Sequence, residues 1–363
     1  MRAGFVLVLA AATVWGEDWP QFRGPGGQGH SKEKNLPVEW SETTNVIWKT
    51  AIPGKGWSSP SIAGDTIWMT TSTEEGHSLR LLGVDRETGK LVKDVEVFKL
   101  EGKIPIHLKN SQASPTPIVE GDRVYVHFGS HGTACVRTSG EVAWKRKLEY
   151  YHRHGPGGSP LSYEDMLIIS CDGYDSQYVV ALDKKTGEIR WKKPRPGYQA
   201  YTTPLAIPVN GRDQILSVGA WRAVSYDPRS GEEIWSVRYG KGYSNVPRPV
   251  FGHGLVYICT GFDQADLLAV RPDGQGDVTN THIAWTNKRG IPLTPSPVLV
   301  DDLLYFVSDN GVATSLDAKT GQERWRKRLG GDFSASPVYA DGRIYFLSEE
   351  CEAGILLDGA GEA

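Results

Sequence analysis

The chain is built from short apolar runs that are separated by Asp, Asn and Gly. The stretch from Thr294 to Gly330 shows this most clearly, because TPSPVLVDD, LLYFVSDNG, VATSLDAKTG and QERWRKRLG follow one another. Each run is rich in β-branched and aromatic residues and is followed by residues that accept tight hairpin geometry. The pattern predicts four antiparallel strands joined by hairpins, with few helices.

The same segment recurs along the chain. ALDKKTGEIRW ends at Trp191, SYDPRSGEEIW ends at Trp235 and SLDAKTGQERW ends at Trp325, with a weaker copy around Gly89. A period in the forties is typical of chains in which each repeat forms one supersecondary unit. The turn glycines that mark the repeats are 44 to 51 residues apart: Gly89, Gly140, Gly187, Gly231, Gly276 and Gly321.

Seven repeats begin in this chain. A four-stranded sheet cannot bury both of its faces alone, so successive units must stack, and radial closure is the usual solution. We therefore predict an all-β fold, a β-propeller of four-stranded antiparallel blades. Six repeats start with a Ser-Pro or Thr-Pro dipeptide, at Pro60, Pro115, Pro160, Pro204, Pro297 and Pro337, and the remaining one starts with VPRP around Pro247 and Pro249.

Tryptophans follow the repeated turns and are predicted to dock one blade on the next. The turn that contains Asp183 and Gly187 is expected to fix a hairpin, so that the Trp on the returning strand presents a large apolar surface. The first repeat has Lys93 at this position and the fifth has Asn280, with Trp285 displaced, so two irregular joints are expected. The docking residues stand four positions after the glycine: Trp144, Trp191, Trp235 and Trp325.

The two ends of the repeat array complement each other. NVIWKTAIP contains Trp48, which precedes Pro60 by 12 residues, as Trp325 precedes Pro337. We predict that it supplies a fourth strand to the sheet begun by SASPVYADGRIYFLSEECEAGILLDG, because an unpaired edge would expose backbone donors and acceptors. If the array is instead one blade short, a gap should separate Trp48 from the 340s.

The N-terminus has the features of a secretory signal. Arg2 precedes an apolar stretch from Phe5 to Ala12, which is too short to cross a bilayer, and small residues follow. We predict a signal peptide at 1–16, a lead segment at 17–39 and the propeller at 40–363, in a periplasmic or secreted, monomeric protein without a transmembrane segment after cleavage. The four cysteines are isolated, and buried thiols or one or two disulfides both remain open: Cys135, Cys171, Cys259 and Cys351.

The repeat resembles that of a known family. ALDKKTGEIRW is similar to the tryptophan-docking motif of pyrroloquinoline-quinone-like (PQQ-like) β-propellers, and the likeness runs from about Trp48 to the C-terminus. The lead DWPQFRGP resembles secreted bacterial proteins of the planctomycete type, related to the propeller of the outer-membrane β-barrel assembly machinery. The resemblance implies the fold, and many members of the family have eight blades. It does not fix the function, because enzymes and non-enzymes share the repeat.

The remaining chemistry favours binding over catalysis. The net charge of −3, from 40 basic and 43 acidic residues, offers no basic field for nucleic acid. The quinoprotein dehydrogenases that the motif resembles use adjacent cysteines and calcium ligands, and this chain has no adjacent cysteine pair. We expect no cofactor and no metal, because the histidines of HFGSHG and HRHGPGG have no third ligand nearby in sequence. The alternative is a quinoprotein oxidoreductase that uses pyrroloquinoline quinone with calcium.

The loops before the first strands are predicted to surround one mouth of the ring. Aromatic and polar groups at a concave end are typical of binding sites. We predict a non-catalytic binding or scaffolding module with a protein or glycan partner at this mouth. The candidate contacts are Trp57, Asn110, Gln112, His152, His154, Tyr198, Tyr201, Tyr243, Arg248, Asp332 and Phe333.

Overall fold

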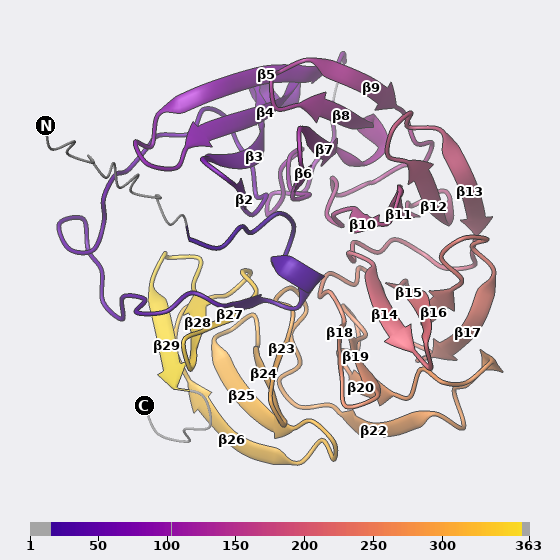
Figure 1. Ribbon diagram of the computed structural model, residues 1–363. Coiled ribbons are helices and arrows are strands. Elements are labelled where there is room, and N and C mark those ends of the chain that lie inside the picture. Colours follow the sequence, from indigo (N-terminus) through magenta and orange to yellow (C-terminus); the bar gives the residue numbers. More distant parts are fainter. Residues whose placement is uncertain (1–15, 103, 358–363) are drawn as a thin grey trace, which may run out of the picture.

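The computed structural model describes residues 16–102 and 104–357. Seven sheets stand side by side around a central axis, and four of them consist of four consecutive strands of the chain (Figure 1). Strands joined by hairpins run antiparallel, as the hairpin pattern predicts, and two further short strands pair in parallel at sheet edges. The fold is a β-propeller. No helix within the described ranges is long and apolar enough to span a membrane.

Each blade begins with an inner strand and runs outward. The first three blades are β2 (Ser61–Ala63), β3 (Thr66–Thr73), β4 (Ser78–Asp85), β5 (Leu91–Lys99); β6 (Ile118–Glu120), β7 (Arg123–His127), β8 (Thr133–Arg137), β9 (Val142–Arg146); and β10 (Leu161–Tyr163), β11 (Met166–Asp172), β12 (Gln177–Asp183), β13 (Ile189–Pro194). The fourth and fifth are β14 (Leu205–Val209), β15 (Arg212–Val218), β16 (Arg222–Tyr226), β17 (Glu233–Arg238); and β18 (Val250–Gly252), β19 (Leu255–Cys259), β20 (Leu267–Val270), β22 (Ile283–Asn287). The sixth and seventh are β23 (Val298–Val300), β24 (Leu303–Val307), β25 (Val312–Asp317), β26 (Glu323–Arg328); and β27 (Val338–Ala340), β28 (Arg343–Leu347), β29 (Ala353–Leu357).

The predicted repeat starts coincide with the inner strands. A proline stands directly before the first residue of every inner strand, from Pro60 before Ser61 to Pro337 before Val338. Proline is tolerated at the start of a strand because its missing N–H costs the sheet no hydrogen bond there. The predicted proline is therefore confirmed directly before the inner strand in six blades, and in the second blade Pro117, two residues after the predicted Pro115, takes this position.

The core lies between the blades. Six clusters of buried apolar side chains each join two neighbouring blades, such as the cluster of Leu205, Trp235 and Val256 between blades four and five. The buried cysteines Cys135, Cys171 and Cys259 belong to strands of this core, whereas Cys351 is exposed, and all four are free thiols. The six clusters join blades one to seven in succession.

The repeated Asp-Thr-Gly turn has one geometry. Oδ1 of Asp183 accepts hydrogen bonds from the backbone N–H of Thr186 at 2.8 Å and from its hydroxyl at 3.2 Å. The N–H of Gly187 donates to the carbonyl of Asp183, and Gly187 has φ +72°, which favours glycine. These contacts use the carboxylate to hold the hairpin. The same Asp to Thr or Ser contact occurs at Asp85, Asp227 and Asp317.

The tryptophans dock on the turn of the next blade. A Cβ on Gly187 would lie 2.5 Å from Cε3 of Trp144, so only glycine admits the indole ring. The indole N–H donates to the carbonyl that follows the turn Asp: Trp144 to Lys184 at 3.0 Å and Trp191 to Pro228 at 2.9 Å. The predicted docking role is present at these joints.

Of the two joints predicted to be irregular, the fifth is regular and the first is not. Trp285 packs on Gly321 and donates to the carbonyl of Ala318 at 3.0 Å, so the fifth joint is regular and the expected irregularity there is wrong. The reason is an insertion before β22, which includes β21 (Gly276–Asp277) and moves the docking position from Asn280 to Trp285. At the first joint Lys93 replaces the tryptophan and donates to the carbonyl of Ser139 at 3.2 Å.

Trp235 is fully buried but does not dock on Gly276. Its indole N–H donates to Oε1 of Gln214 at 2.8 Å within the same blade. Gly276 lies in β21, which pairs in parallel with β17 and places Gly276 opposite Trp235. Trp325 has an indole N–H without a hydrogen-bond partner among the described residues, and the turn on which it is predicted to dock lies outside them.

The lead segment crosses the centre of the ring (Figure 1). It contains η1 (Pro25–Gly27) and β1 (His30–Ser31), and β1 pairs in parallel with the inner strand β27. The buried guanidinium of Arg23 donates to the carbonyls of Pro297 at 2.7 Å and Gln28 at 2.9 Å, and buried Arg248 donates to those of Pro204 and Phe22. Part of the segment predicted to precede the propeller, from Phe22 to Ser31, thus lies at the axis and adds a strand to the seventh blade.

The predicted closing strand is wrong. Residues 46–53 form no strand, and within the described chain β29 has no strand paired on its outer side. Trp48 nevertheless packs on Gly89 and donates to the carbonyl of Arg86 at 3.1 Å, as a docking tryptophan does. The segment is thus fixed to blade one by its side chain and is not joined to blade seven by its backbone (Figure 1).

Candidate functional site

The loops at one mouth of the propeller lie in two sets. One set joins the fourth strand of a blade to the first strand of the next, and the other joins the second and third strands within a blade. Both leave the same end of the sheets because strand direction alternates in a meander. The residues predicted for the mouth belong to the first set, and the second set contributes side chains of its own.

Five aromatic residues form a continuous row over blades three to five, which we call the aromatic arc. The ring of Tyr198 lies at its centre, stacked on Trp221 with an interplanar angle of 8° and centroids 6.1 Å apart. Tyr174 and Tyr243 contact Tyr198 edge to face at 5.5 and 5.6 Å, and Phe262 contacts Tyr243 at 5.6 Å. Such contacts hold the rings in place at separations that favour aromatic pairs.

The outer members of the arc face solvent. Tyr174 is 46% exposed, Trp221 is 42% exposed and Phe262 is 53% exposed. Contiguous apolar surface of this kind on a water-exposed loop cluster marks an interaction site more often than single exposed residues do. The guanidinium of Arg153 lies 5.2 Å from the ring centroid of Tyr174 and adds a cation at the edge of the arc.

Trp221 is held in an unusual backbone conformation. Its φ is +67°, in the left-handed region that bulky residues rarely occupy. Its N–H donates to the carbonyl of Gly242 at 2.9 Å, and its carbonyl accepts from the N–H of Tyr239 at 3.0 Å. Two backbone hydrogen bonds therefore hold the strained turn that places this indole on the surface.

Three histidines lie behind the mouth, where blades two and three meet. The Nε2 atoms of His131 and His152 are 3.2 Å apart, and Nε2 of His127 is 3.4 Å from the hydroxyl of Tyr150. The N–H of Ser130 donates to Nδ1 of His152 at 2.9 Å, so the proton of this neutral imidazole is on Nε2. Nε2 of His152 therefore has no lone pair for a metal ion and donates to His131.

Burial keeps this cluster uncharged. It lowers the pKa of His127 and His152 to about 3 and that of His131 to about 4, with the neighbouring histidines adding to the effect at His127 and His152. The neutral side chains of His131 and His152 are hydrogen-bonded to each other and so join the loops where blades two and three meet. The cluster supports the mouth and offers no positive charge to a ligand at neutral pH.

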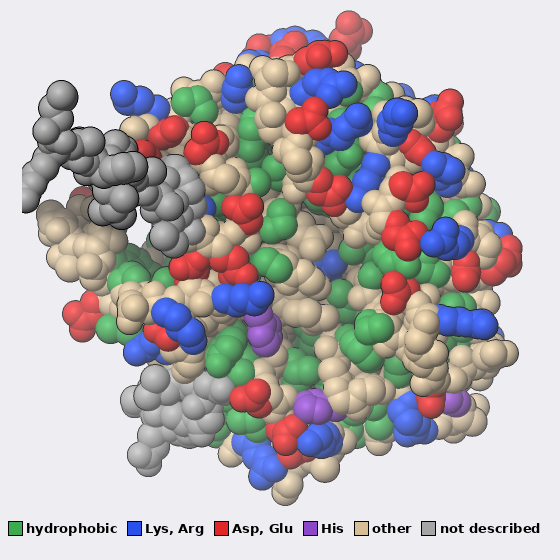
Figure 2. Space-filling model, in the orientation of Figure 1, with side chains coloured by type: hydrophobic (Ala, Val, Ile, Leu, Met, Phe, Trp, Pro, Cys, Tyr) green, Lys and Arg blue, Asp and Glu red, His purple; other side chains and the backbone are tan. Residues whose placement is uncertain are grey.

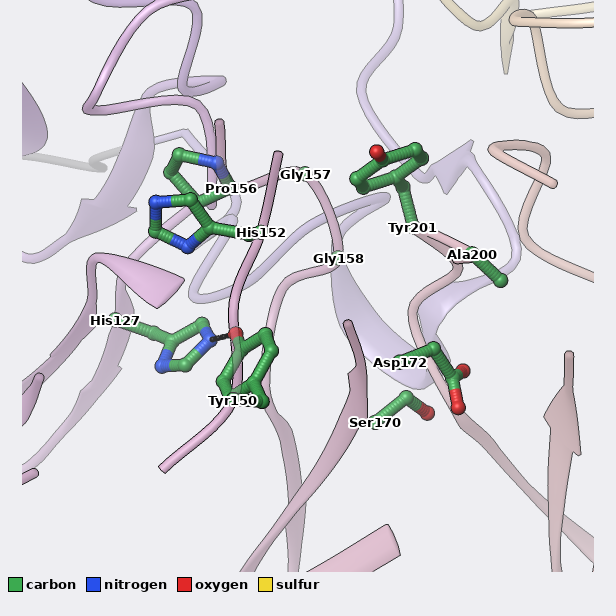
Figure 3. Close-up of a pocket in the computed structure, with 10 residues that line it drawn as sticks. All are labelled: His127, Tyr150, His152, Pro156, Gly157, Gly158, Ser170, Asp172, Ala200 and Tyr201. Atoms are coloured by element: carbon green, nitrogen blue, oxygen red, sulfur yellow. Dashed lines mark hydrogen bonds between the residues drawn. The ribbon is translucent and has the colours of Figure 1, made fainter. Parts of the chain in front are cut away.

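A small cavity lies beside the histidines (Figure 3). Its volume is about 10 Å³, room for about one water molecule, and its lining includes His127, Tyr150 and Tyr201. The buried hydroxyl of Tyr201 has no hydrogen-bond partner among the described residues, and a water in this cavity would satisfy it. Asp172, also in the lining, is already paired with buried Arg195 through Nε at 2.9 Å. The cavity is too small for an organic ligand.

The glycines of HGPGG serve packing. A Cβ on Gly157 would lie 2.7 Å from Cβ of Tyr201, and a Cβ on Gly158 would lie 2.6 Å from the carbonyl oxygen of Thr202. These distances are below any ordinary contact, so the two residues must be glycine for the loop to pass. The segment is not arranged as a phosphate-binding loop, because no helix of the described chain follows it.

The predicted mouth residues divide into surface and support. Tyr198 and Tyr243 belong to the aromatic arc, whereas Asn110 donates to the carbonyls of His154 and Pro156 at 2.9 and 3.0 Å and so ties two loops together. The remaining loop residues lie near this junction but do not join the arc. They are buried Gln112, whose Oε1 is 3.1 Å from Nε2 of His131, buried His152, and half-buried His154 and Tyr201.

Arg248 and Phe333 are not at the surface of the mouth. Arg248 is 1% exposed and binds carbonyl oxygens at the axis, and Phe333 is 2% exposed within the core of blades six and seven. Asp332 and Trp57 are exposed, and neither contacts the arc. The proline-flanked loops place some of their side chains inward, which sequence position alone does not reveal.

Comparison with known proteins now adds to this geometry. The family profile of outer membrane protein assembly factor BamB matches residues 30–156, 84–280 and 277–359. The chain belongs to the BamB family. The match reaches from the lead segment to the last described blade and confirms the PQQ-like repeat.

The relatives of this BamB-family chain are distant. Outer membrane protein assembly factor BamB of Shewanella oneidensis is 24% identical over 202 residues, which cover 54% of this chain and 46% of that protein. The structure of BamB from Moraxella catarrhalis aligns with a TM-score of 0.60 at 17% identity, over 81% of this chain and 82% of that one. Quinohemoprotein alcohol dehydrogenase from Comamonas testosteroni aligns with a TM-score of 0.50 at 13% identity, over 90% and 76%. At these identities the structural likenesses show the fold alone.

The residues of this BamB-family chain do not fit a quinone with calcium. Calcium requires several oxygen ligands at one place, and no group of three His, Cys, Asp or Glu side chains in residues 16–102 and 104–357 is arranged to hold a metal ion. The repeated turn carboxylates are used within their hairpins, and the lead segment fills the axis.

The sequence analysis missed Tyr174, Trp221 and Phe262. Each stands in the loop between the second and third strands, in DGYDS, GAWRA and TGFDQ, directly after a small residue. An aromatic at the same loop position in three successive repeats is the signal that could have revealed them. It was overlooked because only the loops before the inner strands were compared.

Proposed function

We propose that the protein is a non-catalytic, extracytoplasmic scaffolding module that binds a protein partner through the aromatic arc. The observation that carries the proposal is the exposed, ordered row from Tyr174 to Phe262. Tyr, Trp, Phe and Arg are enriched where proteins bind one another. The three aromatic residues contribute a large contact area with few rotamers to fix. Arg153 at the edge of the arc would pair with a carboxylate of the partner.

Family membership supports binding over catalysis. The BamB relatives are named as outer membrane protein assembly factors, and a scaffold of this kind needs a stable surface and no reactive groups. Most groups near the mouth whose pKa is shifted are histidines and tyrosines that burial holds uncharged. A glycan partner would use the same exposed rings by stacking and is the alternative outcome of the test below.

The extracytoplasmic location is part of the proposal. Residues 1–15 lie outside the described residues, and the composition of residues 1–16 supports export with cleavage after Gly16. Expression of the full chain in a bacterial host and N-terminal sequencing of the exported protein should give Glu17 as the first residue. Recovery of uncleaved protein in the cytoplasm would contradict it.

The partner surface can be tested by site-specific photocrosslinking. A photoreactive amino acid at Phe262 should crosslink a protein in the source organism, whereas the same group at Trp57, an exposed aromatic outside the arc, should not. With the identified partner purified, Trp221→Ala should weaken binding at least tenfold, as expected for an aromatic anchor that becomes buried in the complex. Trp57→Ala should have no effect. Equal losses for the two variants, or binding of an oligosaccharide and no protein, would overturn the proposal.

A further inference from the structure

The outer edge of the seventh blade differs from that of every other blade. In blades one to six the third strand carries a fourth strand on its outer side, whereas β29 has none among the described residues. The N–H of Ser348 donates to the carbonyl of Glu352 at 2.9 Å, so the backbone groups of Glu352, Gly354 and Leu356 face β28. In an antiparallel ladder these groups alternate, and those of Ala353 and Ile355 therefore point outward.

The register of the other blades defines what belongs on this edge. In the sixth blade Tyr305, Ser315 and Trp325 lie opposite one another across three strands. In the seventh blade Tyr345 lies opposite Ile355, and the third position is unoccupied in the described chain. A tryptophan takes this position in five of the six complete blades: Trp144, Trp191, Trp235, Trp285 and Trp325.

Tyr345 lacks the contacts that its counterparts make. In blades two, five and six the tyrosine ring lies 6.3, 5.8 and 5.9 Å from the docking tryptophan. The hydroxyl of Tyr257 also donates to the carbonyl of Ala318 in the next blade at 3.1 Å. The buried hydroxyl of Tyr345 has no hydrogen-bond partner in residues 16–102 and 104–357. This is a second sign, independent of the backbone, that the edge receives a further strand.

A groove lies beside the edge. Its volume is about 830 Å³, and it separates residues 351–353 from residues 38–49. Val38, Trp40 and Val46 give it an apolar wall, and all three are more than 40% exposed. Its size and lining suit the side chains of an extended strand.

The charges of the groove are mainly negative. Glu39, Glu42 and Glu352 line it with a single cation, Lys49, which is paired with Glu42 at 2.6 Å. The fourth strands of this chain are basic after the docking tryptophan, as in VAWKR and ERWRKR. A strand of that composition would complement the carboxylates of the groove.

We propose that β29 accepts an antiparallel strand from a partner polypeptide whose sequence carries an aromatic residue followed by basic residues. The aromatic side chain takes the position opposite Ile355 and packs on Tyr345, and the basic residues face the glutamates of the groove. Main-chain hydrogen bonds provide the affinity and alternate side chains provide the selectivity, as in other cases of strand addition to a sheet edge. The site is separate from the aromatic arc and does not depend on the function proposed for it.

A synthetic peptide with the sequence GQERWRKRLG, which is residues 321–330 of this chain, tests the proposal. Labelled with a fluorophore and added to the full chain, it should bind saturably, and hydrogen exchange at residues 353–357 should slow. Replacing its Trp by Ala should weaken binding at least tenfold. N-methylation of the Trp amide, which would face β29, should abolish binding, whereas N-methylation of the following Arg amide, which faces away, should be tolerated.

Matched variants of the protein locate the site. The triple variant Glu39→Gln/Glu42→Gln/Glu352→Gln should weaken binding severalfold at low salt, whereas neutralising three exposed glutamates elsewhere, Glu75, Glu87 and Glu101, should not. All six side chains are exposed, so both triple variants should fold. Equal binding of the two N-methylated peptides would overturn the proposal. So would loss of binding on Trp221→Ala, because it would assign the peptide to the mouth.

Discussion

At the scale of single residues, polar side chains in this propeller mostly hold backbone in place. Asp183 uses its carboxylate for the N–H and hydroxyl of Thr186, and the hydrogen bonds of that turn, together with those from Arg190, hold the pKa of this carboxyl below its usual value although partial burial opposes them. The same reasoning explains why the turn aspartates are not candidates for catalysis. A side chain that is already saturated with donors has little capacity left for a substrate.

The docking tryptophan gives the clearest single-residue prediction. Trp191 is 7% exposed, packs on Gly231 and donates to the carbonyl of Pro228. Trp191→Ala should lower the free energy of unfolding by about 3 to 5 kcal/mol, because it empties a large aromatic site. Urea denaturation measures this, with Trp57→Ala as the exposed control, expected to lose under about 0.5 kcal/mol. A loss under about 1 kcal/mol for Trp191→Ala would contradict the docking role.

The buried histidines predict a loss of stability in acid. Their folded pKa values are lowered, so the unfolded chain binds more protons below about pH 6.5, and the stability present above that pH falls as the pH drops toward 4. Between pH 7 and 4.5 each histidine should contribute a loss of roughly 2 kcal/mol. His152→Asn retains an acceptor for the N–H of Ser130 and removes one titrating group. The free energy of unfolding of this variant, measured by urea denaturation, should therefore fall less steeply as the pH is lowered. An unchanged slope would disprove the assignment.

At the scale of elements, the repeated hairpin depends on a glycine for two separable reasons. Gly187 has φ +72° and leaves no room beside Trp144, whereas Gly211 has φ +76° with open space around it. Gly211→Ala should therefore cost about 1 to 2 kcal/mol of stability from the backbone alone. Gly187→Ala should cost a further 1 to 3 kcal/mol, roughly, because the indole must move. Equal losses in thermal or urea denaturation would show that docking adds nothing.

Local elements were predictable from the sequence and distant pairings were not. The alternation of apolar residues and the proline before each inner strand specify the hairpins, since both act within a few residues. The parallel pair of His30 with Tyr339 has no local pattern, because it depends on contacts more than 300 residues apart. The shift of the docking position to Trp285 was unpredictable for the same reason. It depends on an insertion whose residues pair with β17, a strand of the preceding blade.

The candidate site was predictable in part. Tyr198 and Tyr243 were found because their loops follow fourth strands, and Trp221 was missed although it occupies a repeated loop position. Arg248 was expected at the mouth because it is charged, yet it is buried and satisfied by carbonyl oxygens. Burial depends on the lead segment, which reaches Arg248 only in the folded ring.

At the scale of the whole molecule, positive and negative side chains are interspersed around the rim, as Figure 2 shows for one face. No large field of one sign forms on that face, which agrees with the small net charge of −3. Long-range electrostatic attraction of nucleic acid is therefore not expected from it. Recognition should depend on close contact at the arc and at the open sheet edge.

The lead segment predicts a global loss when its central arginine is removed. Arg23→Met should lower the free energy of unfolding by about 3 kcal/mol, because it removes charge-assisted hydrogen bonds to Pro297 and Gln28. Hydrogen exchange at β27 should rise at the same time. Lys34→Met, in the exposed part of the segment, is the control and should lose under about 1 kcal/mol. Unchanged exchange at β27 would show that the axis is held without Arg23.

The crossing of the axis by the lead segment also has a consequence for the order of folding. Arg23 bonds to a residue 314 positions later, so this contact cannot form until nearly the whole chain has been made. At about 5 to 20 residues per second, synthesis alone separates the two partners by roughly 15 to 60 seconds. The hairpins can form locally in that interval, since each needs only its own turn. The lead segment, which is synthesised before any blade, is therefore among the last to reach its place, and its arrival completes the assembly of blades that have already formed.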